Sequence, residues 1–166
     1  MQEHAKAGIP ISPKPFTTVF ESFDNLLPKG YAYAELFKRL ASDKLKLAAK
    51  KVQVFPYGST AYKEAKRKNL PFFSPHCQTK GLKKRDTIQH SGVFCFDVDK
   101  KDNPALDFER LKEIFREEPS VLGYFSSVGG GLKVFIRVRS NLESHQNDYL
   151  QVLSWIENMS HPEFSR

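Results

Sequence analysis

The stretch GVFCFDVDKKDN, residues 92–103, predicts a buried strand that ends in two carboxylates. Residues 92–96 carry no charge, as in a strand covered on both faces. Asp97 and Asp99 follow, and alternate side chains of a strand point to the same side. Carboxylates placed in this way repel each other unless a cation lies between them. The stretch therefore indicates either a divalent-metal site or the solvated start of a loop.

The chain on the C-terminal side of this stretch predicts an α+β fold. Asn103-Pro104 is typical of a helix start, with Asn as the cap and Pro in the first turn. Strands are expected at residues 121–127 and 132–138, and Ser140 or Asn141 would begin a last helix. This order is most of a ferredoxin-like or RRM-like split β-α-β unit, which would have one more strand after the last helix. We expect that strand to be missing from this chain.

The N-terminal side contributes a flexible arm, residues 1–14, and the first part of a single domain that spans residues 15–166. Apolar periodicity predicts a strand over 17–23, a helix that starts at Tyr31, and a second helix over 43–51. A short strand over 52–55 would follow, then a helix over 61–69 capped by Ser59 or Thr60, and a strand over 70–75.

Charge is distributed unevenly along the chain. The formal net charge is +7. Residues 44–85 hold twelve Lys or Arg and one acid, Glu64, so this window carries +11 and the rest of the chain −4. The domain thus has a basic half that ends at about residue 88 and a half over 89–166 that contains the acid pair. A basic half beside an acidic site favours a nucleic-acid partner, and a solvated lysine-rich surface is the alternative.

A second candidate site is the segment SSVGGGLKVFIRV, residues 126–138. Three glycines exceed what a tight hairpin requires, and their backbone N–H groups could approach an anion closely. Hydroxyls and an ammonium group flank these glycines, as expected of a phosphate-binding loop. A flexible hairpin without a ligand is the alternative interpretation. The candidate phosphate-binding residues are Ser126, Ser127, Gly129, Gly131 and Lys133.

A third candidate is the basic window itself, in which Tyr57, Tyr62, Phe72 and Phe73 are interleaved with cations. Such aromatics stack on bases while Lys and Arg contact phosphates, although Phe72 and Phe73 are expected to belong to the core. The candidate nucleic-acid contacts are Lys63, Lys66, Arg67, Lys80, Lys83, Lys84, Arg85 and Arg137.

Several other functions are not supported by the sequence. The five histidines and two cysteines lack zinc-ligand spacing, and no G-x-S-x-G nucleophile motif occurs. The residues after Asp97 do not match a calcium loop, since Asp102 stands where that loop requires Gly. No apolar run approaches the length of a membrane helix, and no signal peptide is evident. We expect a cytoplasmic protein that does not engage membranes.

Taken together, three segments resemble one family: YKEAKRKNLPFFSPHC, HSGVFCFDVDKKDN and YFSSVGGGLKVFIRV. They are similar to the BT4734-like, or VirE N-terminal, domains of Bacteroidetes proteins and their mobile elements. That family is in turn similar to the primase-polymerase superfamily. The resemblance covers roughly residues 50–140 and implies a primase-polymerase-like fold.

The resemblance also implies roles for particular residues. Asp97 and Asp99 would hold Mg²⁺ or Mn²⁺, and Ser126 and Lys133 would contact the triphosphate of a nucleotide. Histidine is usual in that superfamily where Lys133 stands; lysine still binds phosphate as a point charge. A third acid would complete the metal site. Glu143, Asp148 and Glu163 are the acids considered for this position.

Three hypotheses follow. The first is a primase-polymerase-like domain that binds DNA or RNA, expected to be single-stranded, together with a nucleoside triphosphate. It would be a nucleotidyltransferase if a third acid is supplied elsewhere. The second is a non-catalytic module for single-stranded nucleic acid that serves a helicase or a C-terminal domain of the same protein. The third is a D-x-D nucleotide-sugar transferase, for which the basic half has no evident use.

Overall fold

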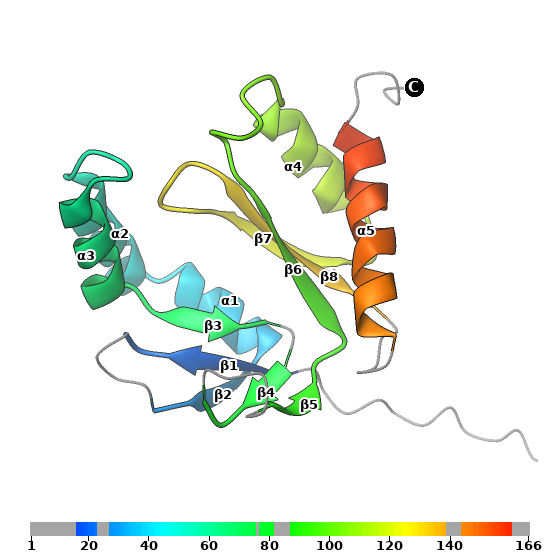
Figure 1. The fold of residues 1–166 in the computed structure, drawn as a ribbon, viewed down its shortest axis with the longest axis horizontal. Helices are drawn as coiled ribbons and strands as arrows, with labels where there is room; N and C mark the ends of the chain where they lie inside the picture. Colours follow the sequence, from blue (N-terminus) through cyan, green and yellow to red (C-terminus); the bar gives the residue numbers. More distant parts are fainter. Residues whose placement is uncertain (1–15, 23–26, 76, 82–86, 139–143, 161–166) are drawn as a thin grey trace, which may run out of the picture.

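The computed structural model describes residues 16–22, 27–75, 77–81, 87–138 and 144–160, which form an α+β fold (Figure 1). The strands of the described residues pair antiparallel in three small sheets with the orders β2-β1-β3, β4-β5 and β6-β8-β7. In chain order the elements are β1 (Phe16–Phe20), β2 (Lys29–Ala32), α1 (Tyr33–Leu40), α2 (Asp43–Gln53), α3 (Thr60–Asn69), β3 (Phe72–Ser74), β4 (Cys77–Thr79), β5 (Thr87–His90), β6 (Val93–Val98), α4 (Phe108–Glu117), β7 (Val121–Ser126), β8 (Leu132–Arg137) and α5 (His145–Ser160).

The sheet β6-β8-β7 is buried on both faces, as the uncharged run of β6 predicted. Phe94 and Phe96 point to one face, where they pack with buried residues of α4 and α5. Val93 and Cys95 point to the other face, toward α1 and β1. Figure 1 shows α4 and α5 together on one side of this sheet. Since side chains alternate along a strand, Asp97 belongs to the face that looks toward α1.

Helix α4 begins later than the sequence predicted. Its N-cap is Asp107, whose Oδ1 accepts hydrogen bonds from the N–H groups of Glu109 and Arg110, both at 3.0 Å. The predicted start at Asn103-Pro104 is therefore wrong. Asn103 instead closes the turn after the acid pair, because its Nδ2 donates to the Asp99 carbonyl at 3.0 Å.

Phe135 of β8 is the centre of the second core, between the main sheet and the N-terminal elements. Its ring is fully buried and lies against the rings of Tyr33, Phe37, Phe73 and Phe125. The predicted apolar stripe of α1 therefore packs on this face of the sheet. Phe73, predicted to belong to the core, packs here as well.

Helices α2 and α3 form a hairpin at one end of the molecule (Figure 1). Ser42 and Ser59 cap them, accepting from the N–H groups of Leu45 and Tyr62. The strand predicted over 52–55 is wrong, because α2 continues through Gln53. Its Val52 is buried and follows Leu45 and Ala49 at helical spacing.

Two short segments were not predicted: β2, and the β4-β5 pair. The latter is tied to β1 where the N–H of Thr79 donates to the Thr18 hydroxyl at 3.0 Å. Within the described residues, α5 is the one element that follows β8. The predicted arm, residues 1–14, lies outside the described residues, as do Ser140 and Asn141. Across the part of the chain that is described, every helix is too short or too polar to cross a bilayer.

Candidate functional site

The acid pair lies at the end of β6, on the side of the sheet that faces the α2–α3 hairpin. Asp97 is opposite Lys133 in the β6–β8 register. The Lys133 ammonium donates a hydrogen bond to the Asp97 carboxylate, and the two side chains are 27% and 48% exposed. The predicted proximity of Lys133 to the acids is thus present in the structure. It takes the form of an ion pair, which the sequence did not predict.

The two carboxylates fit a cation that also takes ligands from a substrate. Both lie at one strand end, Asp97 exposed and Asp99 half-buried. Among the described residues no cluster of three His, Cys, Asp or Glu side chains is placed to hold a metal. Mg²⁺ is commonly bound by one or two carboxylates plus substrate phosphates. The donor set therefore suits one Mg²⁺ or Mn²⁺ that completes its coordination with water or with phosphate oxygens.

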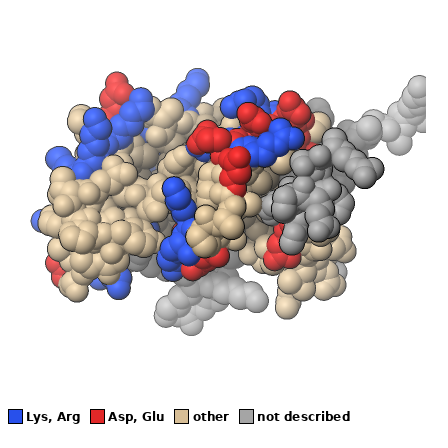
Figure 2. Space-filling view, turned by 90° about the horizontal axis from the view of Figure 1, so that it is seen from above, with Lys and Arg blue, Asp and Glu red and all other residues tan. Residues whose placement is uncertain are grey.

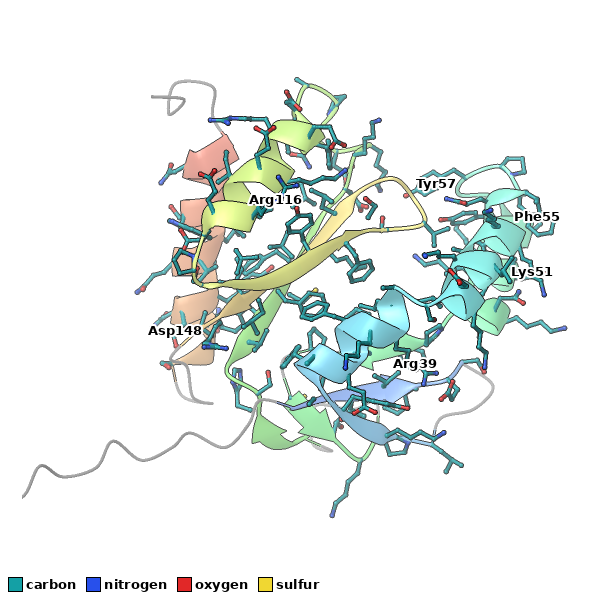
Figure 3. All side chains as sticks on the ribbon, turned by 180° about the vertical axis from the view of Figure 1, so that it is seen from behind. Arg39, Lys51, Phe55, Tyr57, Arg116 and Asp148 are labelled. Atoms are coloured by element: carbon teal, nitrogen blue, oxygen red, sulfur yellow. The ribbon has the colours of Figure 1, made fainter. Side chains whose placement is uncertain are left out.

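The third acid is not supplied by α5. Asp148 accepts a hydrogen bond from the Ser144 hydroxyl at 2.5 Å. Its helix covers the face of the sheet opposite Lys133, and Figure 3 shows Asp148 far from the tip of the β7–β8 hairpin, where the glycine turn lies. The other two candidates, Glu143 and Glu163, lie outside the described residues.

The glycine segment forms a closed turn beside the acid pair. The N–H of Ser127 donates to the Gly131 carbonyl at 2.7 Å, and the N–H of Gly130 donates to the Ser127 carbonyl at 3.0 Å. The N–H of Gly131 donates to the Ser127 hydroxyl at 3.2 Å. A Cβ on Gly131 would be 2.4 Å from the Val98 carbonyl oxygen, so only glycine allows this approach to β6. Two of the three glycine N–H groups are therefore engaged within the turn.

A cleft of about 250 Å³ opens between the α2–α3 hairpin and the end of β7. Its walls are mostly apolar, and Phe125 and Phe73 lie side by side in it, with ring centroids 6.2 Å apart. Three ammonium groups and two hydroxyls stand around these walls. The lining residues are Leu40, Leu45, Lys46, Ala49, Lys66, Leu70, Pro71, Phe72, Phe73, Phe125, Ser126, Ser127, Val128 and Lys133.

Two tyrosines connect the hairpin to the glycine turn. The rings of Tyr57 and Tyr62 are 5.2 Å apart in a T-shaped arrangement. A Cβ on Gly129 would be 2.7 Å from the Tyr57 ring, and Figure 3 shows Tyr57 next to the tip of the β7–β8 hairpin. Tyr62 is buried and is the one buried side chain of α3. Both were predicted as stacking aromatics; the structure instead packs Tyr62 inward.

The predicted basic residues are only partly brought together. Lys63 and Lys66 lie on α3, exposed, and Lys66 lines the cleft. Arg67 lies on the same helix. Figure 2 shows Lys and Arg side chains along the end of the molecule formed by α2 and α3. Lys80 directly follows β4 and does not line the cleft. Lys83, Lys84 and Arg85 lie outside the described residues.

Arg137, a predicted nucleic-acid contact, lies away from Lys133 at the other end of β8. Both side chains belong to one face of β8, but Phe135 stands between them and is buried. Four residues of strand separate the two cations by roughly 13 Å. Arg137 therefore lies at the opposite end of the strand from the cleft.

Sequence reasoning missed Lys46 and Phe125 as cleft residues. Lys46 forms an exposed ion pair with Asp43 at 3.0 Å, and Phe125 is paired with Lys133 in the β7–β8 register. A helical spacing of Leu45, Ala49 and Val52 was the available signal for the inward face of α2. The sequence carried no comparable signal for Phe125. In a strand that is covered on both faces, an apolar residue of a cleft cannot be distinguished by pattern from an apolar residue of the core.

Cys95 lies on the same face of β6 as Asp97. Burial raises the pKa of its thiol to about 12; Lys133 lowers this pKa and Asp97 raises it. Since the thiolate is the reactive and metal-binding form, Cys95 is an inert packing residue at neutral pH.

Comparison with known proteins agrees with the resemblance that the motifs indicated. Residues 64–164 match the family model described as "BT4734-like, N-terminal domain", which is more than half of the chain. No curated protein and no solved structure matches. The matched range contains the acid pair, the glycine turn and Lys133, together with most of α3. The chain belongs to the BT4734-like N-terminal domain family.

Proposed function

We propose that this domain is a primase-polymerase-like module that binds a nucleoside triphosphate with Mg²⁺ or Mn²⁺, and single-stranded nucleic acid, in the cleft. Its context would be the replication of DNA or of a mobile element. Asp97 and Asp99 would hold the metal, and Ser126, Ser127 and Lys133 would contact phosphates.

One observation carries the proposal: three lysines from three different elements surround one apolar cleft beside a pair of carboxylates. Lys46 comes from α2, Lys66 from α3 and Lys133 from β8. Apolar and aromatic walls suit a base, whereas ammonium groups suit a polyphosphate. A cleft that combines both properties next to two acids matches a nucleotide bound with a divalent cation.

The Asp97–Lys133 ion pair supplies a way to couple the two ligands. The metal, when bound, would supply positive charge that offsets the phosphates. Engagement of Asp97 in that role releases the Lys133 ammonium, which then has phosphate oxygens as its best partners. The Ser126 hydroxyl, at the end of β7, and Ser127 lie in the same cleft wall and offer further donors.

The alternative is a module that binds single-stranded nucleic acid without catalysis. The observation that supports it is that no third acid of the described residues joins Asp97 and Asp99, since phosphoryl transfer with two metals requires more carboxylates. In that case Lys133 neutralises Asp97 permanently, and the basic α2–α3 hairpin is the working surface. This arrangement does not support a transferase for nucleotide sugars, because such a function would leave the basic α2–α3 hairpin without a role.

Calorimetric titration separates these functions. We expect Mn²⁺ with a deoxynucleoside triphosphate to bind the wild-type domain, and Asp97→Asn to weaken that binding at least tenfold. The matched control is Asp102→Asn, which removes an exposed carboxylate paired with Lys101. Equal nucleotide affinity in wild type and Asp97→Asn would contradict the metal–nucleotide proposal.

Fluorescence anisotropy with a labelled oligonucleotide tests the nucleic-acid surface. We expect Lys46→Ala with Lys66→Ala to weaken binding and to reduce the salt dependence by about 0.7 in log–log slope per lysine. Lys112→Ala is the control, because Lys112 lies on α4 and pairs with Glu109. Retained single-strand binding without metal-dependent nucleotide binding would establish the non-catalytic alternative.

A further inference from the structure

Tyr62 has a buried hydroxyl that makes no hydrogen bond to any described residue. The residue is 5% exposed, on a helix whose other described side chains face solvent or are only half-buried. A buried hydroxyl without a partner destabilises a folded protein, whereas phenylalanine would fill the same space without that cost. The hydroxyl therefore requires an explanation beyond packing.

The position of Tyr62 is set by several contacts. The Ser59 hydroxyl accepts from the Tyr62 N–H at 3.1 Å, which anchors the residue in the first turn of α3. Its ring meets Tyr57, and Tyr57 lies against Gly129 of the glycine turn. The glycine turn also lies against the end of β6, where a Cβ on Gly131 would be 3.1 Å from the Asp99 Cα. Tyr62 is thus linked to the acid pair through Tyr57 and the glycine turn.

The acid pair differs in how its two carboxylates relate to this hydroxyl. Burial raises the pKa of Tyr62, and Tyr57 and the Asp99 carboxylate raise it further. The two acids also differ. Asp97 has Lys133 as its partner, whereas the Asp99 carboxylate receives no hydrogen bond from the described residues; only its main-chain carbonyl is bonded, to Asp102 and Asn103. The Tyr62 hydroxyl is thus a donor without an acceptor, and the Asp99 carboxylate is an acceptor without a donor among the described residues.

We propose that Tyr62 is a positioning residue for Asp99: its hydroxyl donates to the Asp99 carboxylate when that carboxylate holds a divalent cation. This inference rests on the metal site of the proposed function. A carboxylate that binds a metal through one oxygen needs a hydrogen bond on the other to fix its orientation, and loss of such a partner typically weakens metal binding 10- to 100-fold. Asp97 and Asp99 then have different partners: the Lys133 ammonium pairs with Asp97, and the Tyr62 hydroxyl orients Asp99.

The test is the pair Tyr62→Phe and Tyr57→Phe in the full chain, each titrated with Mn²⁺ and followed by the electron paramagnetic resonance signal of the free ion. We expect Tyr62→Phe to bind Mn²⁺ roughly 10- to 100-fold more weakly than wild type. Tyr57→Phe removes the hydroxyl of a residue that is 56% exposed and should leave the affinity unchanged. The thermal unfolding midpoint of Tyr62→Phe without metal should equal or exceed that of wild type.

Two results overturn the inference while leaving the metal site intact. One is equal Mn²⁺ affinity in wild type and Tyr62→Phe. The other is a lower unfolding midpoint of metal-free Tyr62→Phe, which would show that the hydroxyl has a structural partner such as a bound water. If wild type binds Mn²⁺ no better than Asp97→Asn, the metal site itself is refuted, and the role of Tyr62 with it.

Discussion

The β6-β8-β7 sheet and the α2–α3 hairpin are built in opposite ways. The sheet and its two helices enclose a core with eight buried apolar residues, whereas α2 and α3 bury one side chain each, Val52 and Tyr62. Apolar burial is the main favourable contribution to folding. The sheet therefore contributes most of the stability and holds Asp97 and Lys133 in register, while the hairpin presents cations around the cleft with little core of its own.

The largest effect should come from truncation of the central aromatic residue. Phe135→Ala removes a fully buried ring in contact with four others and should lower the free energy of unfolding by about 3–5 kcal/mol. Val52→Ala should cost only about 2 kcal/mol, because it removes two methyl groups. Urea unfolding followed by circular dichroism measures both. An equal loss in the two variants would show that the hairpin is as important for stability as the sheet.

The next effect concerns the glycine turn, where the two regions meet. Gly131→Ala places a methyl group against the main-chain carbonyl of Val98, which has no freedom to move, and should cost about 1–3 kcal/mol. Gly129→Ala meets the ring of Tyr57, a half-exposed side chain that can rotate away, so its loss should be smaller. Thermal unfolding of both variants gives the comparison. A greater loss of stability in Gly129→Ala than in Gly131→Ala would mean that the Tyr57 side chain is fixed in place.

A smaller effect is expected from Lys133→Ala, which should change the affinities for Mn²⁺ and for nucleotide in opposite directions. Without nucleotide, removal of the ammonium that occupies Asp97 should raise Mn²⁺ affinity by roughly 2- to 5-fold, the range of a partly exposed ion pair. With nucleotide present, loss of a phosphate contact should lower nucleotide affinity. Calorimetry measures both, and Lys112→Ala is the control. Lower Mn²⁺ affinity in the absence of nucleotide would contradict the exchange of Lys133 and metal at Asp97.

The smallest effect is a pH dependence in the N-terminal sheet. Burial raises the pKa of Glu21, but Arg39 and Lys29 outweigh this and leave it below the ordinary value of 4.5. A carboxyl whose pKa is lower in the folded state contributes stability that is present above 4.5 and is lost as pH falls through the folded-state pKa. Since the pair is partly exposed, the contribution should be well under 1 kcal/mol. Wild type and Glu21→Gln should differ in urea midpoint at pH 7, and their midpoints should converge near pH 3. A difference between the two midpoints that does not change with pH would contradict this prediction.

Most of the C-terminal elements could be predicted from local pattern. The uncharged run of β6 and the two strands around the glycines each depend on neighbours in sequence. The errors came from signals that are locally ambiguous. VQVF alternates like a strand but completes a helical spacing with Leu45 and Ala49. Asn103-Pro104 is a good helix start, yet Asn103 bonds to Asp99 and Asp107 caps the helix instead.

The chemical residues of the candidate site were identifiable from sequence, and their partners were not. Asp97, Asp99, Lys133 and the glycines stand out by type and spacing, because carboxylates after an apolar strand and glycines between strands are unusual there. The Asp97–Lys133 pair depends on which residues face each other across two strands that are 36 positions apart. The cleft requires α2, α3 and β7 to converge, and the unpartnered Tyr62 hydroxyl is defined only by what surrounds it. Contacts between distant segments are decided by packing, which no local pattern encodes.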